Sequence, residues 1–192
     1  MTTPGECRGP FRPMPQALST DRLRLRRWSP DDRRAVRNLW RERDPRVPAR
    51  RRIDAQDRPT EAQVGTSIAT QVEESARTGL QMYAVELRAA PGVIGYCGLS
   101  IGDATEAEPE IVFELARSVH GRGFATEAAI AVRDAGRDTG RSRLWASVRE
   151  WNTASFRVLS KLGFTDSGRR DPDPFHGDIV WTTLGPDDPS TG

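Results

Sequence analysis

The stretch Glu110-Ile-Val-Phe-Glu-Leu-Ala-Arg-Ser-Val-His-Gly-Arg-Gly-Phe-Ala-Thr-Glu127 decides the fold of this chain of 192 residues. Residues 111–115 alternate apolar with polar or β-branched side chains, which is typical of a pleated strand. Gly121 and Gly123 then flank one arginine, and residues 125–137 are rich in alanine and lack proline, which predicts a helix. The first N–H groups of such a helix point out of its positive end, so this turn is a candidate phosphate site.

Composition places the chain among globular proteins, because 36% hydrophobic and 29% charged residues suit one domain with a sizeable core. The first 60 residues hold 16 basic and 8 acidic side chains, whereas residues 61–192 hold 13 basic and 19 acidic ones. Cys7 and Cys97 are too few for a disulfide framework or a zinc cluster, so we expect a cytoplasmic protein without a metal. The chain has no apolar leader and no run of about 18 apolar residues, which argues against a membrane partner.

The chain divides into one domain and two short ends. Residues 1–18 are proline-rich with little apolar periodicity, and we expect them to form a disordered tail. Residues 19–184 carry the periodic segments and are expected to form the domain. Residues 185–192 are polar and expected to fray.

Periodicity and capping residues predict the elements of this domain. Helices are expected over residues 30–43, 60–79, 125–137 and 156–162. Strands are expected over residues 22–28, 82–87, 93–99, 111–115, 143–148, 164–167 and 179–184. Pro91-Gly92 fits the turn of a hairpin, and this hairpin leads into a strand–helix–strand crossover. The order predicts an α+β (mixed α/β) single domain whose central mixed, mostly antiparallel sheet has helices on both faces.

The Gly-x-Gly turn by itself also fits a purely structural turn. It is not the phosphate loop of nucleoside triphosphatases, because Gly-x-x-x-x-Gly-Lys-Ser/Thr does not occur. It is not a dinucleotide fingerprint either, since the third glycine of that pattern would fall at Thr126. The turn also lies in mid-chain behind a hairpin, whereas a dinucleotide-binding domain usually opens with it.

Residues 110–127, together with Asn152-x-x-Ser155-x-x-x-Leu159-x-Lys161-x-Gly163-Phe164, resemble the two signatures of the GNAT superfamily of acetyl-CoA-dependent N-acetyltransferases. Thr20-Asp-Arg-Leu-Arg-Leu-Arg26 resembles the RimJ/RimL type, which includes ribosomal-protein N-terminal acetyltransferases. The resemblance covers about residues 19–184. It implies acetyl-CoA as cosubstrate and a GNAT-like sheet that splays between the strands ending near Leu115 and Val148.

The same resemblance implies how acetyl-CoA is held. Backbone N–H groups of the glycine turn would bind its pyrophosphate, and the splayed strands would hold the pantetheine arm like an added strand. The cofactor-binding residues implied in this way are Leu115, Ala116, Arg117, His120, Gly121, Arg122, Gly123, Phe124, Ala125, Thr126, Asn152 and Ser155.

The candidate catalytic residues are one serine and two glutamates. Leu159 occupies the position at which many members carry a tyrosine that protonates the leaving thiolate. Resemblance to RimL-like enzymes gives that role to Ser155, which could instead cap its helix. Glu110 and Glu114 lie four residues apart on a strand and therefore share a face. They are candidates for the base that deprotonates the amine, or they form a solvated strand face.

The acceptor is expected to be a primary amine that attacks acetyl-CoA directly in a ternary complex. The acidic run Asp103–Glu110 lies where the family resemblance places the acceptor side, which favours a cationic acceptor. Protein N-termini come first by resemblance, ahead of small cationic amines such as a polyamine or an aminoglycoside-like compound.

A rival hypothesis is a noncatalytic RNA- or ribosome-binding module that uses the arginine-rich segment Arg41–Arg58. That segment lacks interleaved aromatic residues for base stacking, so we rank the enzyme first. No DNA partner is expected. Ribosome association and a homodimer are both left open by the sequence.

Overall fold

The computed structural model describes residues 11–48, 51, 53 and 59–185. The strands are β1 (Ala17–Ser19), β2 (Leu23–Arg27), β3 (Met82–Leu87), β4 (Ala90–Ser100), β5 (Glu110–Leu115), β6 (Leu144–Arg149), β7 (Thr165–Asp171) and β8 (Ile179–Leu184). The helices are α1 (Arg33–Arg41), α2 (Glu61–Thr78), α3 (Phe124–Asp138) and α4 (Thr153–Lys161), with short 3₁₀ turns η1 (Pro30–Asp32) and η3 (Arg117–Val119). The described residues therefore form the predicted mixed α/β domain.

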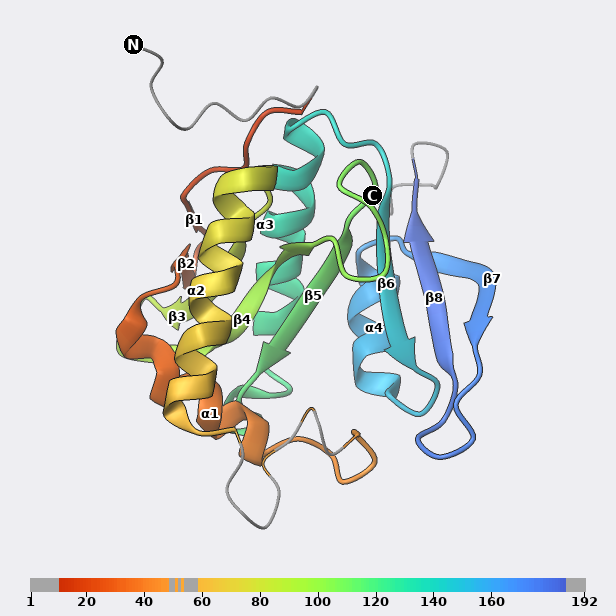
Figure 1. Ribbon diagram of the computed structural model, residues 1–192. Helices are drawn as coiled ribbons and strands as arrows, with labels where there is room; N and C mark the ends of the chain where they lie inside the picture. Colours follow the sequence, from red (N-terminus) through yellow and green to blue (C-terminus); the bar gives the residue numbers. More distant parts are fainter. Residues whose placement is uncertain (1–10, 49–50, 52, 54–58, 186–192) are drawn as a thin grey trace.

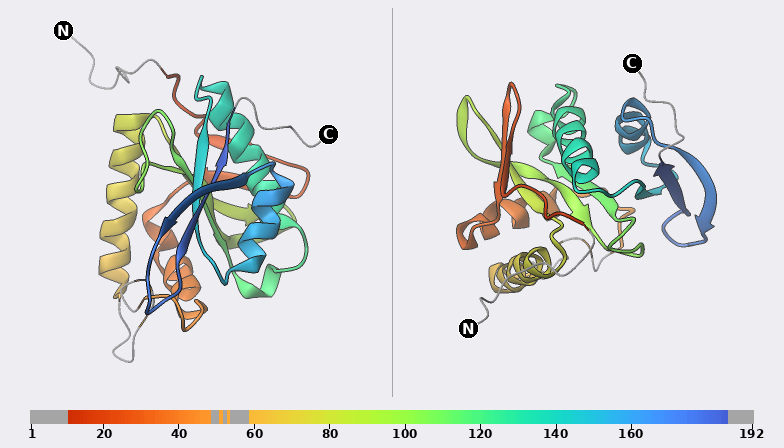
Figure 2. Two further views of the ribbon diagram at one scale, coloured as in Figure 1. Left: turned by 90° about the vertical axis from the view of Figure 1, so that its right-hand side faces the viewer. Right: turned by 90° about the horizontal axis from the view of Figure 1, so that it is seen from above.

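The described strands make one eight-stranded sheet with the order β1-β2-β3-β4-β5-β6-β8-β7. Neighbouring strands are antiparallel except for β5 and β6, which are parallel. Helices α1 and α2 cover one face of the sheet, and α3 and α4 cover the other (Figures 1 and 2). This arrangement confirms the predicted fold class.

Two apolar clusters hold the layers together. The larger one packs α3 and α4 against the sheet and includes fully buried residues such as Ala128, Val132 and Leu159. The smaller one joins Val36 of α1 to Val64 and Ile68 of α2. Because α3 is fixed along its buried face, the glycine turn before it is held in one place relative to β5.

The predicted capping signals were correct. Thr60 and Gln63 form a capping box at the start of α2, and Gly79 ends that helix in the left-handed conformation, with φ 71°. Ser29 and Asp32 form a second capping box, although the first turn after Ser29 is the 3₁₀ turn η1, and α1 itself begins at Arg33.

The expectation of a disordered tail was wrong from residue 11 onward. Met14 is 3% exposed, and its N–H donates to the Gly79 carbonyl at 2.8 Å. The Tyr83 hydroxyl donates to the Pro15 carbonyl at 2.6 Å, and β1 pairs with β2 as an edge strand. Contacts with distant parts of the chain order this segment, and its own sequence gives no periodic signal for them. Residues 1–10, and the expected frayed end beyond Gly185, lie outside the described residues.

Asp32 connects η1 to the sheet. It is 6% exposed and accepts hydrogen bonds from Arg26 Nη1 and Nη2 at 2.8 and 2.9 Å and from Ser29 N at 2.7 Å. Burial alone would raise the pKa of Asp32, but the hydrogen bonds from Arg26 and Ser29 outweigh burial and lower it below its ordinary value of 3.8. Arg26 also bonds Glu86 on β3, so one guanidinium joins three segments.

We predict that Asp32→Ala lowers the free energy of unfolding by roughly 3 kcal/mol, because it leaves the half-buried Arg26 guanidinium short of a partner. Urea unfolding at pH 7 measures this loss, and Asp31→Ala, an exposed neighbour, is the control. Because the folded-state pKa of Asp32 is lowered, its stabilisation is present at neutral pH and is lost as the pH falls through that lowered pKa. A difference from wild type that does not shrink in acid would contradict this account.

Candidate active site

The centre of the candidate site is the divergence of β5 and β6. Their register contains a single pair, Glu110 opposite Trp145, and the Trp145 N–H donates to the Pro109 carbonyl at 2.9 Å. Beyond that pair the two strands separate toward their carboxyl ends, as Figure 1 shows. The predicted splay between the strands ending near Leu115 and Val148 is therefore confirmed.

The register decides which backbone groups face the splay. The Ala116 N–H donates to the Ile94 carbonyl at 2.8 Å, so even-numbered residues at this end of β5 direct their backbone groups toward β4. Phe113 and Leu115 then point theirs toward β6 by the alternation of antiparallel pairing. On β6 the same alternation, counted from Trp145, directs the groups of Ser147 toward β5. These edges suit an extended, amide-bearing ligand.

Three of the residues predicted on the strand end are partly used within the protein. The Ala116 N–H is taken by Ile94, and the Arg117 N–H donates to Glu42 Oε2 at 2.7 Å. The Leu115 carbonyl accepts from His120 Nε2 at 2.8 Å, so this imidazole secures the end of β5.

The sequence-based set missed Phe113 and Ser147. The sequence shows that side chains alternate along β5 and β6. It does not show which strands pair, and the pairing decides which backbone groups of β5 and β6 are left without a neighbouring strand.

The glycine turn has the geometry of an anion site. Gly121 and Gly123 have φ values of 73° and 80°, in the left-handed region that favours glycine. Gly123 is the N-cap of α3, and no side chain caps the helix. The first intrahelical bond runs from Glu127 N to Gly123 O, so the helix does not use the N–H groups of residues 124–126. These N–H groups are available for a phosphate.

Asn152 and Ser155 come together at the start of α4. Asn152 is the N-cap, and its Oδ1 accepts from the Ser155 N–H at 3.2 Å. The alternative in which Ser155 merely caps this helix is therefore wrong, because Asn152 does so. Leu159, one turn further, is 1% exposed and belongs to the core.

The two candidate base residues have different surroundings. Glu110 is 5% exposed and accepts from Asp103 N at 2.9 Å and from Ser147 Oγ at 2.7 Å, so it links β5 to β6 where the splay closes. Glu114 accepts from Arg43 Nε at 2.8 Å and from the Tyr96 hydroxyl at 2.6 Å. Neither lies on a solvated strand face, which corrects that alternative.

Arg43, Glu114 and Tyr96 form one network. Burial alone would lower the pKa of Arg43, but its hydrogen bonds to Glu114 outweigh burial and raise it. Burial and the nearby Glu114 carboxylate raise the pKa of Tyr96, so its hydroxyl stays protonated. The network therefore contains a permanently charged arginine, a compensated carboxylate and a neutral phenol.

The acidic run Asp103–Glu110 lies at the closed end of the splay, at the opposite end of β5 from the glycine turn. Two of its carboxylates have protein partners: Glu110 as described, and Glu108, whose Oε2 accepts from Trp145 Nε1 at 3.0 Å. The electrostatic argument for a cationic acceptor is weaker than the sequence suggested, because two of the four carboxylates in this run are engaged within the fold.

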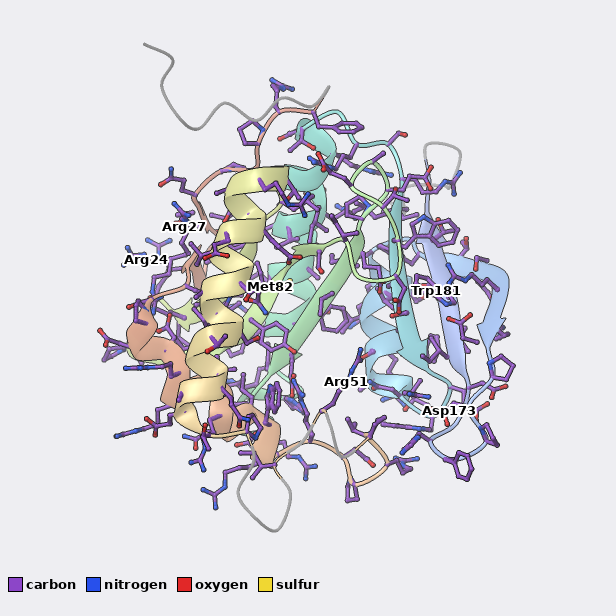
Figure 3. All side chains as sticks on the ribbon, in the orientation of Figure 1. Arg24, Arg27, Arg51, Met82, Asp173 and Trp181 are labelled. Atoms are coloured by element: carbon purple, nitrogen blue, oxygen red, sulfur yellow. The ribbon has the colours of Figure 1, made fainter. Side chains whose placement is uncertain are left out.

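Three connections meet at the open end of the splay. Arg46, which follows α1, lies over the ring of Trp151 with its Cζ 4.1 Å from the ring centroid. Trp151 Nε1 donates to the His176 carbonyl at 2.7 Å, and Arg149 pairs with Asp173 at 2.8 Å. Figure 3 shows Asp173 at the end of the molecule where β5 and β6 terminate. Much of the arginine-rich segment Arg41–Arg58 lies outside the described residues.

In the part of the chain that the structure describes, no helix is both long and apolar enough to cross a membrane. Over the same residues, no group of three or more His, Cys, Asp or Glu side chains is arranged to hold a metal ion.

A model of the acetyltransferase (GNAT) domain matches residues 22–165. The chain belongs to the GNAT acetyltransferase family. It is 27% identical over 155 residues to an N-acetyltransferase named p20 from Bacillus licheniformis, covering 80% of this chain and 84% of that protein. The enzyme is therefore an acyltransferase that uses acetyl-CoA.

Solved structures share the fold of this GNAT enzyme. The ribosomal-protein-S5-alanine acetyltransferase from Vibrio fischeri is 18% identical with a TM-score of 0.71, over 90% of this chain and 97% of that one. An acetyltransferase from Salmonella typhimurium, solved with its cofactor acetyl-CoA, is 15% identical with a TM-score of 0.66, over 88% of this chain and 97% of that one.

The residues of this GNAT enzyme fit acetyl-CoA. An uncapped helix end and the exposed Arg122 beside it suit a pyrophosphate, and the free edges of β5 and β6 suit the amides of pantetheine. Phe124 can contribute only its backbone, because its side chain is 3% exposed in the core.

We predict that Gly123→Ala weakens coenzyme A binding about tenfold. A residue with a Cβ atom pays about 1–2 kcal/mol to adopt the left-handed conformation, and if the backbone leaves that conformation, the N–H groups that follow no longer point at the pyrophosphate. Isothermal titration with coenzyme A measures the effect. Gly92→Ala is the matched control, because Gly92 also has a positive φ, 112°, and lies within β4. The β3–β4 turn is formed by residues 88 and 89, so the prediction of a turn at Pro91-Gly92 was wrong. Equal affinity of both variants would rule out the turn as the pyrophosphate site.

Proposed function

We propose that this enzyme transfers acetyl to the α-amine at a protein N-terminus, as a RimJ/RimL-like acetyltransferase. The observation that carries the proposal is the compensation of Glu114 by Arg43, whose Nη2 lies 2.5 Å from Glu114 Oε2. Glu114 already accepts hydrogen bonds from Arg43 and from Tyr96, so an acceptor whose amine is partly neutral in solution suits this site. An α-amine has a pKa of about 7.7–8.0, against about 10.4 for lysine, and is partly neutral near physiological pH.

Charge at the open end of the splay supports the same acceptor class. A polyamine or an aminoglycoside carries several ammonium groups and is best bound by uncompensated carboxylates. Here Asp173 is paired with Arg149, and Asp44 is paired with Arg46 at 3.0 Å. The name of the Vibrio fischeri neighbour agrees with a protein acceptor, although that likeness extends to the fold alone.

The proposed mechanism is direct attack by the amine in a ternary complex. Acetyl-CoA supplies an acetyl group that is activated as a thioester. Backbone N–H groups of β5 that face the splay would orient and polarise the carbonyl. Glu114 would accept the amine proton through a water molecule, and the Ser155 hydroxyl would protonate the departing sulfur. Glu110 is left with a structural role at the closed end of the splay.

A panel of acceptors tests the substrate class. We expect acetyl-CoA turnover with a peptide that has a free α-amine, and none with the same peptide blocked at its α-amine but carrying a lysine. Turnover should rise with pH toward about 8, as the α-amine loses its proton. Faster turnover of spermidine or an aminoglycoside would replace this proposal with the small-amine alternative.

We predict that Ser155→Ala lowers kcat about 100-fold, the usual contribution of a positioned proton donor, and leaves the KM for acetyl-CoA within about twofold. Ser160→Ala, an exposed serine on the same helix, should match wild type in a thiol-release assay. Unchanged turnover of Ser155→Ala would remove the serine from the mechanism.

A further inference from the structure

Glu127 lies in the first turn of α3, beside the N–H groups proposed to hold the pyrophosphate. Its Oε1 accepts from Thr20 Oγ1 at 2.5 Å and from Arg22 N at 3.0 Å. Its Oε2 accepts from Arg22 Nε at 2.6 Å. The segment between β1 and β2 therefore encloses a carboxylate more than 100 residues away in the chain.

Arg22 also reaches the glycine turn itself. Its Nη1 donates to the Arg122 carbonyl at 3.0 Å, which fixes one peptide of the turn. The guanidinium groups of Arg22 and Arg122 both lie against the Phe124 ring, with Cζ atoms 4.5 and 4.8 Å from its centroid. Since the Phe124 side chain is buried, this ring is a rigid support for both cations.

The charge of Glu127 matters because a pyrophosphate is also an anion. Partial burial works against ionisation of Glu127, but the hydrogen bonds from Thr20 and Arg22 outweigh it and lower its pKa. The carboxylate is thus charged at neutral pH. Without a partner it would oppose the positive end of α3 and repel a bound phosphate. The Arg22 guanidinium supplies the compensating positive charge, and 49% of the Arg22 side chain is exposed to solvent.

We propose that Arg22 is a positioning residue for acetyl-CoA: it neutralises Glu127 and holds the Arg122 peptide, so that the N–H groups of residues 124–126 keep a positive field for the pyrophosphate. This inference rests on the proposed placement of the pyrophosphate on the glycine turn. It assigns a role in cofactor affinity to the connection between β1 and β2, a segment outside the set of cofactor-binding residues that the sequence indicated.

The test compares Arg22→Ala, the double variant Arg22→Ala/Glu127→Gln, and Arg24→Ala as the control. Arg24 is an exposed arginine on β2, two residues after Arg22, and Figure 3 shows it at the far side of the molecule from β6. Two probes are used: coenzyme A for binding by titration, and S-acetylpantetheine, which lacks the diphosphate, as an alternative acetyl donor.

We expect Arg22→Ala to raise the Kd for coenzyme A and the KM for acetyl-CoA about tenfold, with kcat within about twofold, since one compensating charge near a phosphate is worth about 1.4 kcal/mol. The double variant should recover most of that loss, because the unpaired carboxylate is gone. The KM for S-acetylpantetheine should match wild type in both variants, and Arg24→Ala should change neither probe.

Three results would overturn the inference: wild-type coenzyme A affinity in Arg22→Ala, no recovery in the double variant, or an equal loss with S-acetylpantetheine. No recovery in the double variant would indicate that Arg22 contacts the ligand directly. An equal loss with S-acetylpantetheine would indicate general damage to the fold. If Gly123→Ala also binds coenzyme A like wild type, the placement of the pyrophosphate has failed. If only Gly123→Ala weakens binding, the placement stands and the role of Arg22 is refuted.

Discussion

The divergence of β5 and β6 after the Glu110–Trp145 pair is the constraint on which the rest of the structure depends. Exposing strand edges inside a domain is costly unless their N–H and C=O groups find partners. The two strands can separate because each is fastened on its other side, β5 to β4 and β6 to β8, along six residue pairs each. The unpaired edges are thereby kept for a ligand that can add itself as a strand.

Arginine–carboxylate pairs surround this opening, and each joins segments that are distant in the chain. Arg43, in the turn that follows α1, pairs with Glu114 on β5, and Arg149 of β6 pairs with Asp173. Arg22 does the same for Glu127 at the glycine turn. Partly buried pairs of this kind add little net stability. Their common effect is to remove free negative charge from the places where an anionic cosubstrate and an amine would meet.

Local signals accounted for most of the fold. The capping box at Thr60, the glycine stop at Gly79 and the turn of Gly121 and Gly123 depend on a few neighbouring residues, and the structure contains all three. Signals that depend on distant contacts were missed. Residues 11–18 were assigned to a tail because Met14 in this segment is ordered by packing and not by any local pattern. β7 extends beyond the expected residues because β8 continues to pair with it.

The sequence by itself determined the family signatures, the helix that follows the glycine turn and the identity of the candidate side chains. The tertiary structure decided which of them are available. It assigned the Ala116 N–H to Ile94 and left the backbone of Phe113 facing the splay, since strand register is a long-range property. It also placed Arg43 on Glu114, 71 residues away. Compensation of a charge depends on three-dimensional proximity, and no spacing along the chain reveals it.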